Sequence, residues 1–405
     1  MFKSAVIFLC ISLLASCTQD HDATAQHEDS NITIGQRLLI KSQVLGEDRP
    51  YWVYVPESYN DETNSPIKYP VLYLLDGDGF FHSATGLVQY MSAGIGFNAQ
   101  IPEMIVVAIP NTDRSRDLTP THTTVDLDGS EMPFSESSGG GDKFLQFIEE
   151  ELQPEIESSY RTQPFNVLVG HSHGGLLATH AMLESRQIFQ AYIAIDPSLW
   201  WDEGVMIRRA KDLLQNAETL NGHIYISMAN TVVPGFDSQS VKDPITEFSA
   251  LLKSAESPEF RSELQYFEAE DHGSVPLLSL YHGLLFVFDG YMPPPALLYG
   301  EPSALKAHFE RVSDRLGITL LPPEGLINVM GYEMLYFEQD VDKAIELLTL
   351  NTVNYPESFN VYDSLGEAYM VNGDESLAIA NYEKSLELNP NNQNAVEKLR
   401  ALRAE

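Results

Sequence analysis

The 405-residue chain contains few cysteines and few basic residues. Only Cys10 and Cys17 are present, and Cys10 lies in a short apolar run near the N-terminus. If that run is removed as a signal, a single thiol remains and no internal disulfide can form. The 24 basic residues are outnumbered by 58 acidic ones, which gives a formal charge of −34. This excess argues against nucleic acid and anionic lipid as partners, and is more simply a feature that favours solubility.

A long apolar run is also missing. Lys3 precedes the apolar stretch 5–14, which is typical of a signal-peptide core and too short to span a bilayer. No second stretch reaches spanning length. Residues 1–16 are therefore predicted to be a signal peptide, and any membrane contact should come from a lipid alone.

The end of this run, Leu14-Ala15-Ser16-Cys17, resembles a bacterial lipobox. We expect cleavage before Cys17 and lipidation of its thiol; an ordinary secretory signal is the alternative. Residues 17–31 are polar and aperiodic, as in a tether. Thr18 stands where an aspartate signals inner-membrane retention in enteric bacteria. The resemblance thus predicts a cell-envelope lipoprotein, at the outer membrane and facing the periplasm or the cell surface.

The most informative stretch of the chain is Gly170-x-Ser172-x-Gly174. An apolar strand is predicted before it, over 165–169, and a helix after it, over 176–183. The pattern is typical of a nucleophile elbow, where a tight strand-to-helix turn exposes a serine hydroxyl and leaves no room for side chains at the flanking glycines. The alternative is a glycine-rich turn whose serine only caps a helix. The flanking elements favour the nucleophile.

A nucleophilic serine needs a base, and in α/β-hydrolases the chain order is serine, acid, histidine. His272 follows a predicted strand over 263–269 and lies in a loop, so we predict it to be the base; a solvated loop histidine is the alternative. His171 and His173 flank the serine but lack a third ligand at a recognisable spacing. No metal and no cofactor is therefore expected.

Residues 34–291 resemble the putative-esterase family of α/β-hydrolases, which includes esterase D-like and enterochelin esterase-like enzymes. The resemblance implies a central, mostly parallel sheet and a serine esterase with Ser172 and His272 as catalytic pair. It does not name the substrate, because the family spans thioesters, siderophore lactones, feruloylated sugars and acyl transfer. The matching stretches are Tyr69 to Gly77, Ile109 to Pro120, Gly139 to Phe147, the elbow, and Asp196-Pro-Ser-Leu-Trp-Trp-Asp202.

The acid should follow the predicted strand 222–228, but no carboxylate comes directly after it. Asp237 is the first candidate. Asp243 and Glu247 come next along the chain, and Asn230 could orient the imidazole through its amide oxygen. A Ser-His dyad stays open as well.

Two backbone N–H groups are predicted to hold the oxyanion. One belongs to His173, the residue after the nucleophile. The other belongs to Asp78, in the loop after the strand 71–75, where Gly77 makes room for it.

Four further residues are candidates for substrate binding. Arg114 and Arg116 could bind an anionic group through their guanidinium forks, or could pair with Asp117 to pin a loop. Trp200 and Trp201 could line the pocket or pack in the fold. The loop 118–141 is predicted to be a mobile lid or an insertion.

A proline-rich linker, 292–302, ends the hydrolase domain, 32–291. The segment 303–405 is predicted to be helical. Within it, 325–392 resembles about two tetratricopeptide repeats, followed by a capping helix. Small residues at repeat positions let paired helices approach closely.

The sequence thus predicts an α/β-hydrolase that cleaves carboxylic esters through an acyl-enzyme, of siderophores or carbohydrates for example, joined to an all-α repeat segment that could bind a protein partner. Two alternatives are an acyltransferase of the same fold, and a catalytically idle hydrolase domain that serves as a repeat-based binding protein.

Overall fold

The computed structural model describes residues 31–404 except 64, 93–98, 128, 185–187, 217–218 and 232–237. The predicted signal peptide, Cys17, nearly all of the tether and Asp237 lie outside the described residues. The chain from Ile34 onward forms one compact unit. Within the described part of the chain, no helix has the length and apolarity needed to cross a membrane.

Eight strands form one sheet in the order β1-β2-β4-β3-β5-β6-β7-β8. The contacts of β1 with β2 and of β2 with β4 are antiparallel, and all the others are parallel. The predicted fold class is confirmed. The strands are β1 (Gln36–Ser42), β2 (Glu47–Tyr54), β3 (Tyr69–Leu74), β4 (Ile105–Ala108), β5 (Thr162–His171), β6 (Ala191–Ile195), β7 (Gly222–Ala229) and β8 (Phe260–Phe267).

The central strands are continuous apolar runs because helices cover both faces of the sheet. β3, β4 and β6 are buried at every position. β1 lies at the edge and shows mostly exposed and half-buried residues. Burial of the central strands stabilises the sheet. Functional residues are therefore expected in the loops at the ends of the strands.

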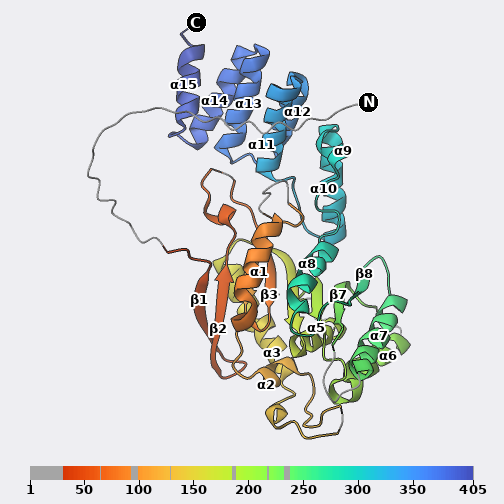
Figure 1. Ribbon diagram of the computed structural model, residues 1–405. Helices are drawn as coiled ribbons and strands as arrows, with labels where there is room; N and C mark the ends of the chain where they lie inside the picture. The colour runs from red at the N-terminus through yellow and green to blue at the C-terminus, as the bar shows by residue number, and fades with distance from the viewer. Residues whose placement is uncertain are drawn as a thin grey trace, which may run out of the picture. The chain divides into compact units, whose positions relative to one another are not determined.

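Helices pack on both faces of the sheet (Figure 1). One apolar cluster joins the sheet to α3–α7, and a second joins it to α1 and α8. The helices of this part are α1 (Gly77–Ser92), α2 (Arg114–Leu118), α3 (Gly141–Phe147), α4 (Gln153–Ser159), α5 (His173–Leu183), α6 (Trp201–Gln215), α7 (Ser238–Ser254) and α8 (Val275–Val287), with a π-turn at Ile148–Leu152 and short 3-10 turns at Glu57–Asn60 and Pro133–Ser135.

The C-terminal segment is helical from α9 to α15. Gly366 allows α13 to approach α14 closely, since a Cβ there would lie 3.1 Å from the Tyr382 ring. Ala344 and Ala378, 34 residues apart by subtraction, are both fully buried. The elements are α9 (Pro295–Leu298), α10 (Pro302–Leu316), α11 (Glu324–Glu333), a π-turn (Met334–Glu338), α12 (Val341–Asn354), α13 (Phe359–Asn372), α14 (Glu375–Leu388) and α15 (Gln393–Leu402).

This helical segment attaches where the parallel strands begin, the edge that we call the amino edge. The Gln163 amide, near the start of β5, donates to the carbonyl of Thr319 at 3.3 Å. The Ser65 N–H, ahead of β3, donates to the buried Glu324 carboxylate at 3.1 Å. The apolar cluster around α1 and α8 also continues into α10, α11 and α12.

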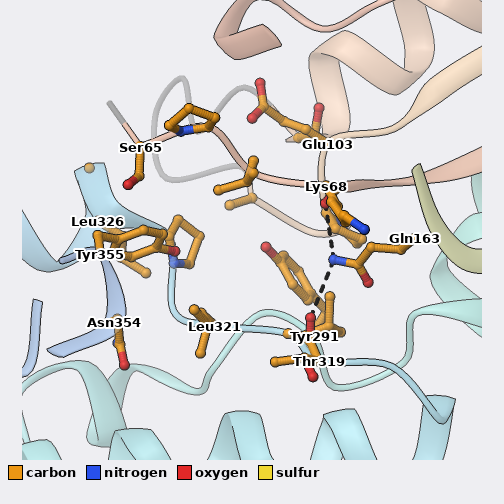
Figure 2. Close-up of a pocket in the computed structure, with 18 of the residues that line it drawn as sticks. Ser65, Lys68, Glu103, Gln163, Tyr291, Thr319, Leu321, Leu326, Asn354 and Tyr355 are labelled. Carbon is orange, nitrogen blue, oxygen red and sulfur yellow. Dashed lines mark hydrogen bonds between the residues drawn. The ribbon is translucent and has the colours of Figure 1, made fainter. Parts of the chain in front are cut away.

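A cavity of about 790 Å³ lies between the amino edge and the helical segment. Figure 2 shows Lys68, Glu103 and Gln163 on the sheet side of this cavity and Leu321 and Tyr355 on the helical side. The elbow serine and His272 are not among its lining residues. The elbow itself lies at the opposite edge, where the parallel strands end, which we call the carboxyl edge.

Candidate active site

Ser172 occupies the sharp turn between β5 and α5. Its backbone is in an unusual conformation, with φ 58° and ψ −115°, a region that costs a non-glycine residue on the order of 1–3 kcal/mol. A Cβ at Gly170 would lie only 2.2 Å from the carbonyl oxygen of Gly174. The predicted elbow geometry is therefore present, and the first glycine is required by the close approach of two backbone segments.

The elbow is held against the end of β6. The Ser172 N–H donates to the Ile195 carbonyl at 3.0 Å, and the Ser198 N–H donates to the Ser172 carbonyl at 3.2 Å. The hydroxyl oxygens of Ser172 and Ser198 are also 3.2 Å apart. The segment that follows β6 is thus in direct contact with the elbow.

His272 lies in the loop between β8 and α8, as predicted, and its imidazole meets a carboxylate. His272 Nδ1 is 2.6 Å from Asp196 Oδ2. Asp196 follows β6 directly, at φ 39°, and is 3% exposed. The carboxylate also accepts hydrogen bonds from the Ala229 N–H at 2.9 Å and from the Thr231 hydroxyl at 3.2 Å. Residues at and just after the end of β7 therefore hold the Asp196 carboxylate in place, so that it connects the end of β6 with the loop after β8.

These hydrogen bonds decide the charge of Asp196. Burial raises the pKa of a carboxyl group, but the hydrogen bonds from His272, Ala229 and Thr231 outweigh burial, so the pKa of Asp196 is below its ordinary value. An ionised Asp196 fixes the His272 proton on Nδ1 and leaves Nε2 as the free, basic nitrogen.

The carboxylate beside His272 is thus not the one that the sequence pattern favoured. Asp237 lies outside the described residues, and the other candidates have different partners. Asn230 Oδ1 accepts from the Lys242 ammonium at 2.7 Å, Asp243 accepts from the Gln239 amide, and Glu247 pairs with Lys211 at 2.6 Å.

The two predicted oxyanion donors both lie in first turns of helices. His173 opens α5, and Asp78 is the second residue of α1. The Gly77 N–H is already bonded to the Ile109 carbonyl at 3.0 Å, and a Cβ at Gly77 would lie 2.7 Å from the Ile109 nitrogen. First-turn N–H groups have no partner within their own helix. The role of these two groups stays a prediction.

Two neutral histidines surround the serine. Burial, and to a lesser degree nearby charge, lowers the pKa of His171 and of His173 to about 4. The His171 ring lies 4.4 Å from that of His272, centre to centre. Among the described residues, no three His, Cys, Asp or Glu side chains group in a way that would hold a metal ion.

Comparison with known proteins adds the family. Residues 42–257 match the sequence profile described as "Esterase: Putative esterase", which is more than half of the chain. The chain belongs to the putative-esterase family. It is a carboxylic ester hydrolase, because both this family and its relatives are esterases.

Two curated relatives of this esterase are similar over most of their own lengths. The ferri-bacillibactin esterase BesA of Bacillus subtilis is 30% identical over 240 residues, which cover 56% of this chain and 81% of that protein. The siderophore triacetylfusarinine C esterase of Aspergillus fumigatus is 26% identical over 273 residues, covering 61% of this chain and 92% of the relative. Among solved structures, an IroE-like serine hydrolase from Shewanella oneidensis is 32% identical, with a TM-score of 0.71, over 79% of this chain and 99% of that one.

The two arginines that were candidates for substrate binding, Arg114 and Arg116, are both engaged in ion pairs. Arg116 binds Glu47 through two nitrogens, at 2.6 and 3.0 Å, and Asp117 at 2.7 Å. The Arg116 guanidinium lowers the pKa of Glu47 to about 2. Arg114 pairs with Asp76 at 2.7 Å. The interpretation in which Arg116 pins a loop therefore fits the structure better than one in which it binds substrate.

The two candidate tryptophans, Trp200 and Trp201, differ in exposure. Trp201 is fully buried, with its indole N–H donating to the Thr121 carbonyl at 3.1 Å and its ring 4.9 Å from that of His173. Trp200 is half-buried, 6.4 Å from the His173 ring. Of the two, only Trp200 therefore offers surface to a pocket.

The loop 118–141 was predicted to be a mobile lid or an insertion. Within it, the Ser135 and Ser138 hydroxyls both donate to the Thr123 carbonyl. The described part of this loop is therefore bonded internally and to the core.

Proposed function

We propose that this esterase acts through a Ser172-His272-Asp196 triad. The observation that supports this proposal is the geometry after β5 and β6. Ser172 and Asp196 both have a positive φ there, and Asp196 Oδ2 lies 2.6 Å from His272 Nδ1. The order serine, acid, histidine along the chain is that of α/β-hydrolases. The assignment replaces Asp237 by Asp196 as the acid.

The proposed reaction has two halves. His272 Nε2 takes the Ser172 proton, and the serine oxygen attacks the ester carbonyl. The N–H groups of His173 and Asp78 hold the oxyanion, and the imidazolium, stabilised by Asp196, then protonates the leaving alcohol. Water, activated by His272, releases the acid and restores Ser172.

We further propose siderophore esters as the substrate class. Support comes from the relatives, whose names give ferri-bacillibactin, triacetylfusarinine C and enterobactin as the compounds hydrolysed.

A fluorophosphonate label and an ester panel test both proposals. Wild-type protein should be labelled at one serine, and Ser172→Ala should lose the label together with roughly a millionfold in turnover. Ser254→Ala, at the surface end of α7, is the matched control and should label normally. A siderophore ester should give a kcat/KM at least roughly tenfold above that of p-nitrophenyl acetate, a difference of about 1.4 kcal/mol. Full labelling of Ser172→Ala would refute the triad, and turnover of acetylated sugars in place of siderophore esters would refute the substrate class.

The N-terminus and the helical segment carry two smaller proposals. Cys17 is proposed as a lipidation site that anchors the enzyme in the outer membrane, and Cys17→Ser should then move the protein from the membrane fraction to the soluble fraction. Residues 325–392 are proposed to be tetratricopeptide repeats that support the hydrolase domain or recruit a protein. The 34-residue spacing of the buried Ala344 and Ala378 supports this reading.

A further inference from the structure

The loop between β8 and α8, which carries His272, is held on both sides of that residue. On the α8 side, the Asp271 carboxylate accepts from the N–H groups of Gly273 and Ser274, both at 2.9 Å, and the Ser274 hydroxyl accepts from the Asp271 N–H at 3.0 Å. These bonds form a local turn ahead of α8. The His272 side chain is 41% exposed, so the position of the imidazole depends on the backbone of this loop more than on packing.

Asn230, the first residue after β7, holds the loop on the β8 side. Its N–H donates to the Glu270 carbonyl at 2.8 Å, and its side-chain amide donates to the Glu268 carbonyl at 3.1 Å. Both carbonyls lie between the end of β8 and His272. Asn230 therefore bonds the segment that leads to the base through its backbone and its side chain at once.

A lysine fixes the orientation of the Asn230 amide. The Lys242 ammonium, on α7, donates to Asn230 Oδ1 at 2.7 Å and lies 5.3 Å from the centre of the Tyr266 ring on β8. A flipped amide would place its NH₂ group against the ammonium and its oxygen against the Glu268 carbonyl. Lys242 thus keeps the amide nitrogen of Asn230 directed at the loop.

The residues on either side of Asn230 hold the acid. The Ala229 N–H and the Thr231 hydroxyl both donate to the Asp196 carboxylate, which lies 2.6 Å from His272 Nδ1. Three consecutive residues at the end of β7 therefore bond in turn to the acid, to the loop of the base, and to the acid again. The relative position of acid and base is set through this tripeptide.

We propose that Asn230 is a positioning residue, which holds the His272 loop at the distance from Asp196 at which acid and base stay in contact. In this role Asn230 acts through the Glu268 and Glu270 carbonyls and touches no reacting atom. The role rests on the proposed triad, because it affects turnover only if Asp196 and His272 are acid and base.

Positioning of the base predicts a particular kinetic effect. A general base acts in the chemical step, so a loosened loop should lower kcat while the KM stays nearly constant. A misplacement of about 1 Å can cost roughly a hundredfold. For Asn230→Ala, in which the backbone bond to Glu270 remains, we expect a loss of roughly tenfold. Because this loss passes through the contact between Asp196 and His272, it should nearly vanish once that contact is already broken.

The test is a double-mutant cycle in the full chain with p-nitrophenyl butyrate. It compares the wild type, Asn230→Ala, Asp196→Asn and the double variant, and Ser172→Ala supplies the background rate. Asn230→Ala should cost roughly tenfold in the wild type but less than roughly threefold beside Asp196→Asn. Asn381→Ala is the matched control, because the Asn381 amide also donates to a backbone carbonyl, that of Leu377 on α14. It should leave kcat unchanged.

Two further measurements separate positioning from a loss of stability. The proton on His272 Nδ1, bonded to a carboxylate, should give a low-field NMR signal in the wild type, and this signal should weaken or shift in folded Asn230→Ala. Asn230→Asp keeps an acceptor for Lys242 but cannot donate to the Glu268 carbonyl. It should therefore resemble Asn230→Ala in kcat, and it gives a second measurement if the alanine variant fails to fold.

The same fold loss in both backgrounds, a raised KM with an unchanged kcat, or an unchanged low-field signal would each overturn the proposal. Full activity of Asn230→Asp would do so as well, since the bond to the Glu268 carbonyl would then not be needed. Wild-type turnover by Asp196→Asn would instead refute the triad on which the proposal rests.

Discussion

The amino edge and the carboxyl edge of the sheet differ in backbone strain. Among the described residues, the non-glycine residues with positive φ are Asp76, Ser172, Asp196, Asp202, Glu203 and Gln339. Ser172 and Asp196 directly follow β5 and β6, and Asp76 lies two residues after β3, all at the carboxyl edge. At the amino edge the helical segment is held by ordinary hydrogen bonds, in which the Gln163 amide donates to the Thr319 carbonyl and the Glu324 carboxylate accepts from the Ser65 N–H. Backbone strain thus marks the edge with the candidate chemistry, and the other edge, despite its 790 Å³ cavity, serves attachment.

The largest effect that tests this contrast should come from Asp196. Asp196→Asn should reduce kcat by roughly ten-thousandfold, because an amide can hold the wrong imidazole tautomer and does not stabilise the imidazolium. Turnover of a simple aryl ester measures the loss. Asp237→Asn and Asp243→Asn should each lose less than roughly tenfold. If Asp237→Asn matched the loss of Asp196→Asn, the acid would be the residue that the sequence favoured.

The dependence of the unfolding free energy on pH should distinguish buried histidines that affect stability alone from those that also affect turnover. His171 at the carboxyl edge and His223 near the amino edge both have a pKa lowered to about 4 by burial. The unfolded chain binds these protons near pH 6.5, so each histidine contributes stability that is complete above about pH 6.5 and is lost as the pH falls toward 4. The slope is about 1 kcal/mol per pH unit for each residue.

Denaturant unfolding of His171→Gln and His223→Gln between pH 7 and pH 4 measures this slope. Both variants should show a flatter dependence of the unfolding free energy on pH. Only His171→Gln should also change kcat, because the His171 ring contacts that of His272. A catalytic defect in His223→Gln would show that the two edges are coupled.

Attachment at the amino edge should affect stability alone. Glu324→Ala leaves the Ser65 N–H and the Ser358 hydroxyl without their acceptor, which should lower the unfolding free energy by about 1–3 kcal/mol. Glu346, exposed on α12, provides the control Glu346→Ala, with a change within about 0.5 kcal/mol. The kcat of both variants should equal that of the wild type. A loss of turnover in folded Glu324→Ala would mean that the helical segment contributes to the site.

The smallest effect should come from Ser198. Its hydroxyl lies 3.2 Å from that of Ser172, longer than a strong O–H···O bond. Ser198→Ala should therefore change kcat by less than roughly tenfold, measured with the same aryl ester. A loss comparable to that of Asp196→Asn would make Ser198 part of the proton-transfer path.

The features that depend on neighbouring residues in the chain could be predicted from the sequence. The elbow needs a glycine at position 170, and the apolar strand before it is a continuous run, so both could be recognised from neighbouring residues. His272 followed from its place after the last strand. The fold class followed from the resemblance together with these alternating elements.

The contact between Asp196 and His272 was not predicted, because it joins residues that are far apart in the sequence. Asp196 stood in a stretch quoted for the family resemblance, but the acid was expected after β7 and not after β6. Both strands end at the same edge, and the choice depends on the path of the His272 loop, which the Asn230 N–H fixes by bonding to the Glu270 carbonyl. Similarly, no local pattern distinguishes Arg114, which bonds to the elbow, from Arg116, which bonds to β2.

The position of β7 has a consequence for how this enzyme can be changed. Asp196 and His272 follow β6 and β8, two inter-strand spacings or roughly 9–10 Å apart, with β7 between them. The hydrogen bonds of Ala229 and Thr231 to the carboxylate make the end of β7 a fixed spacer. The number of residues in the segments 229–231 and 268–271 therefore sets the contact between Asp196 and His272 on which the proposed triad depends. Insertions or deletions there would move the His272 imidazole away from the Asp196 carboxylate.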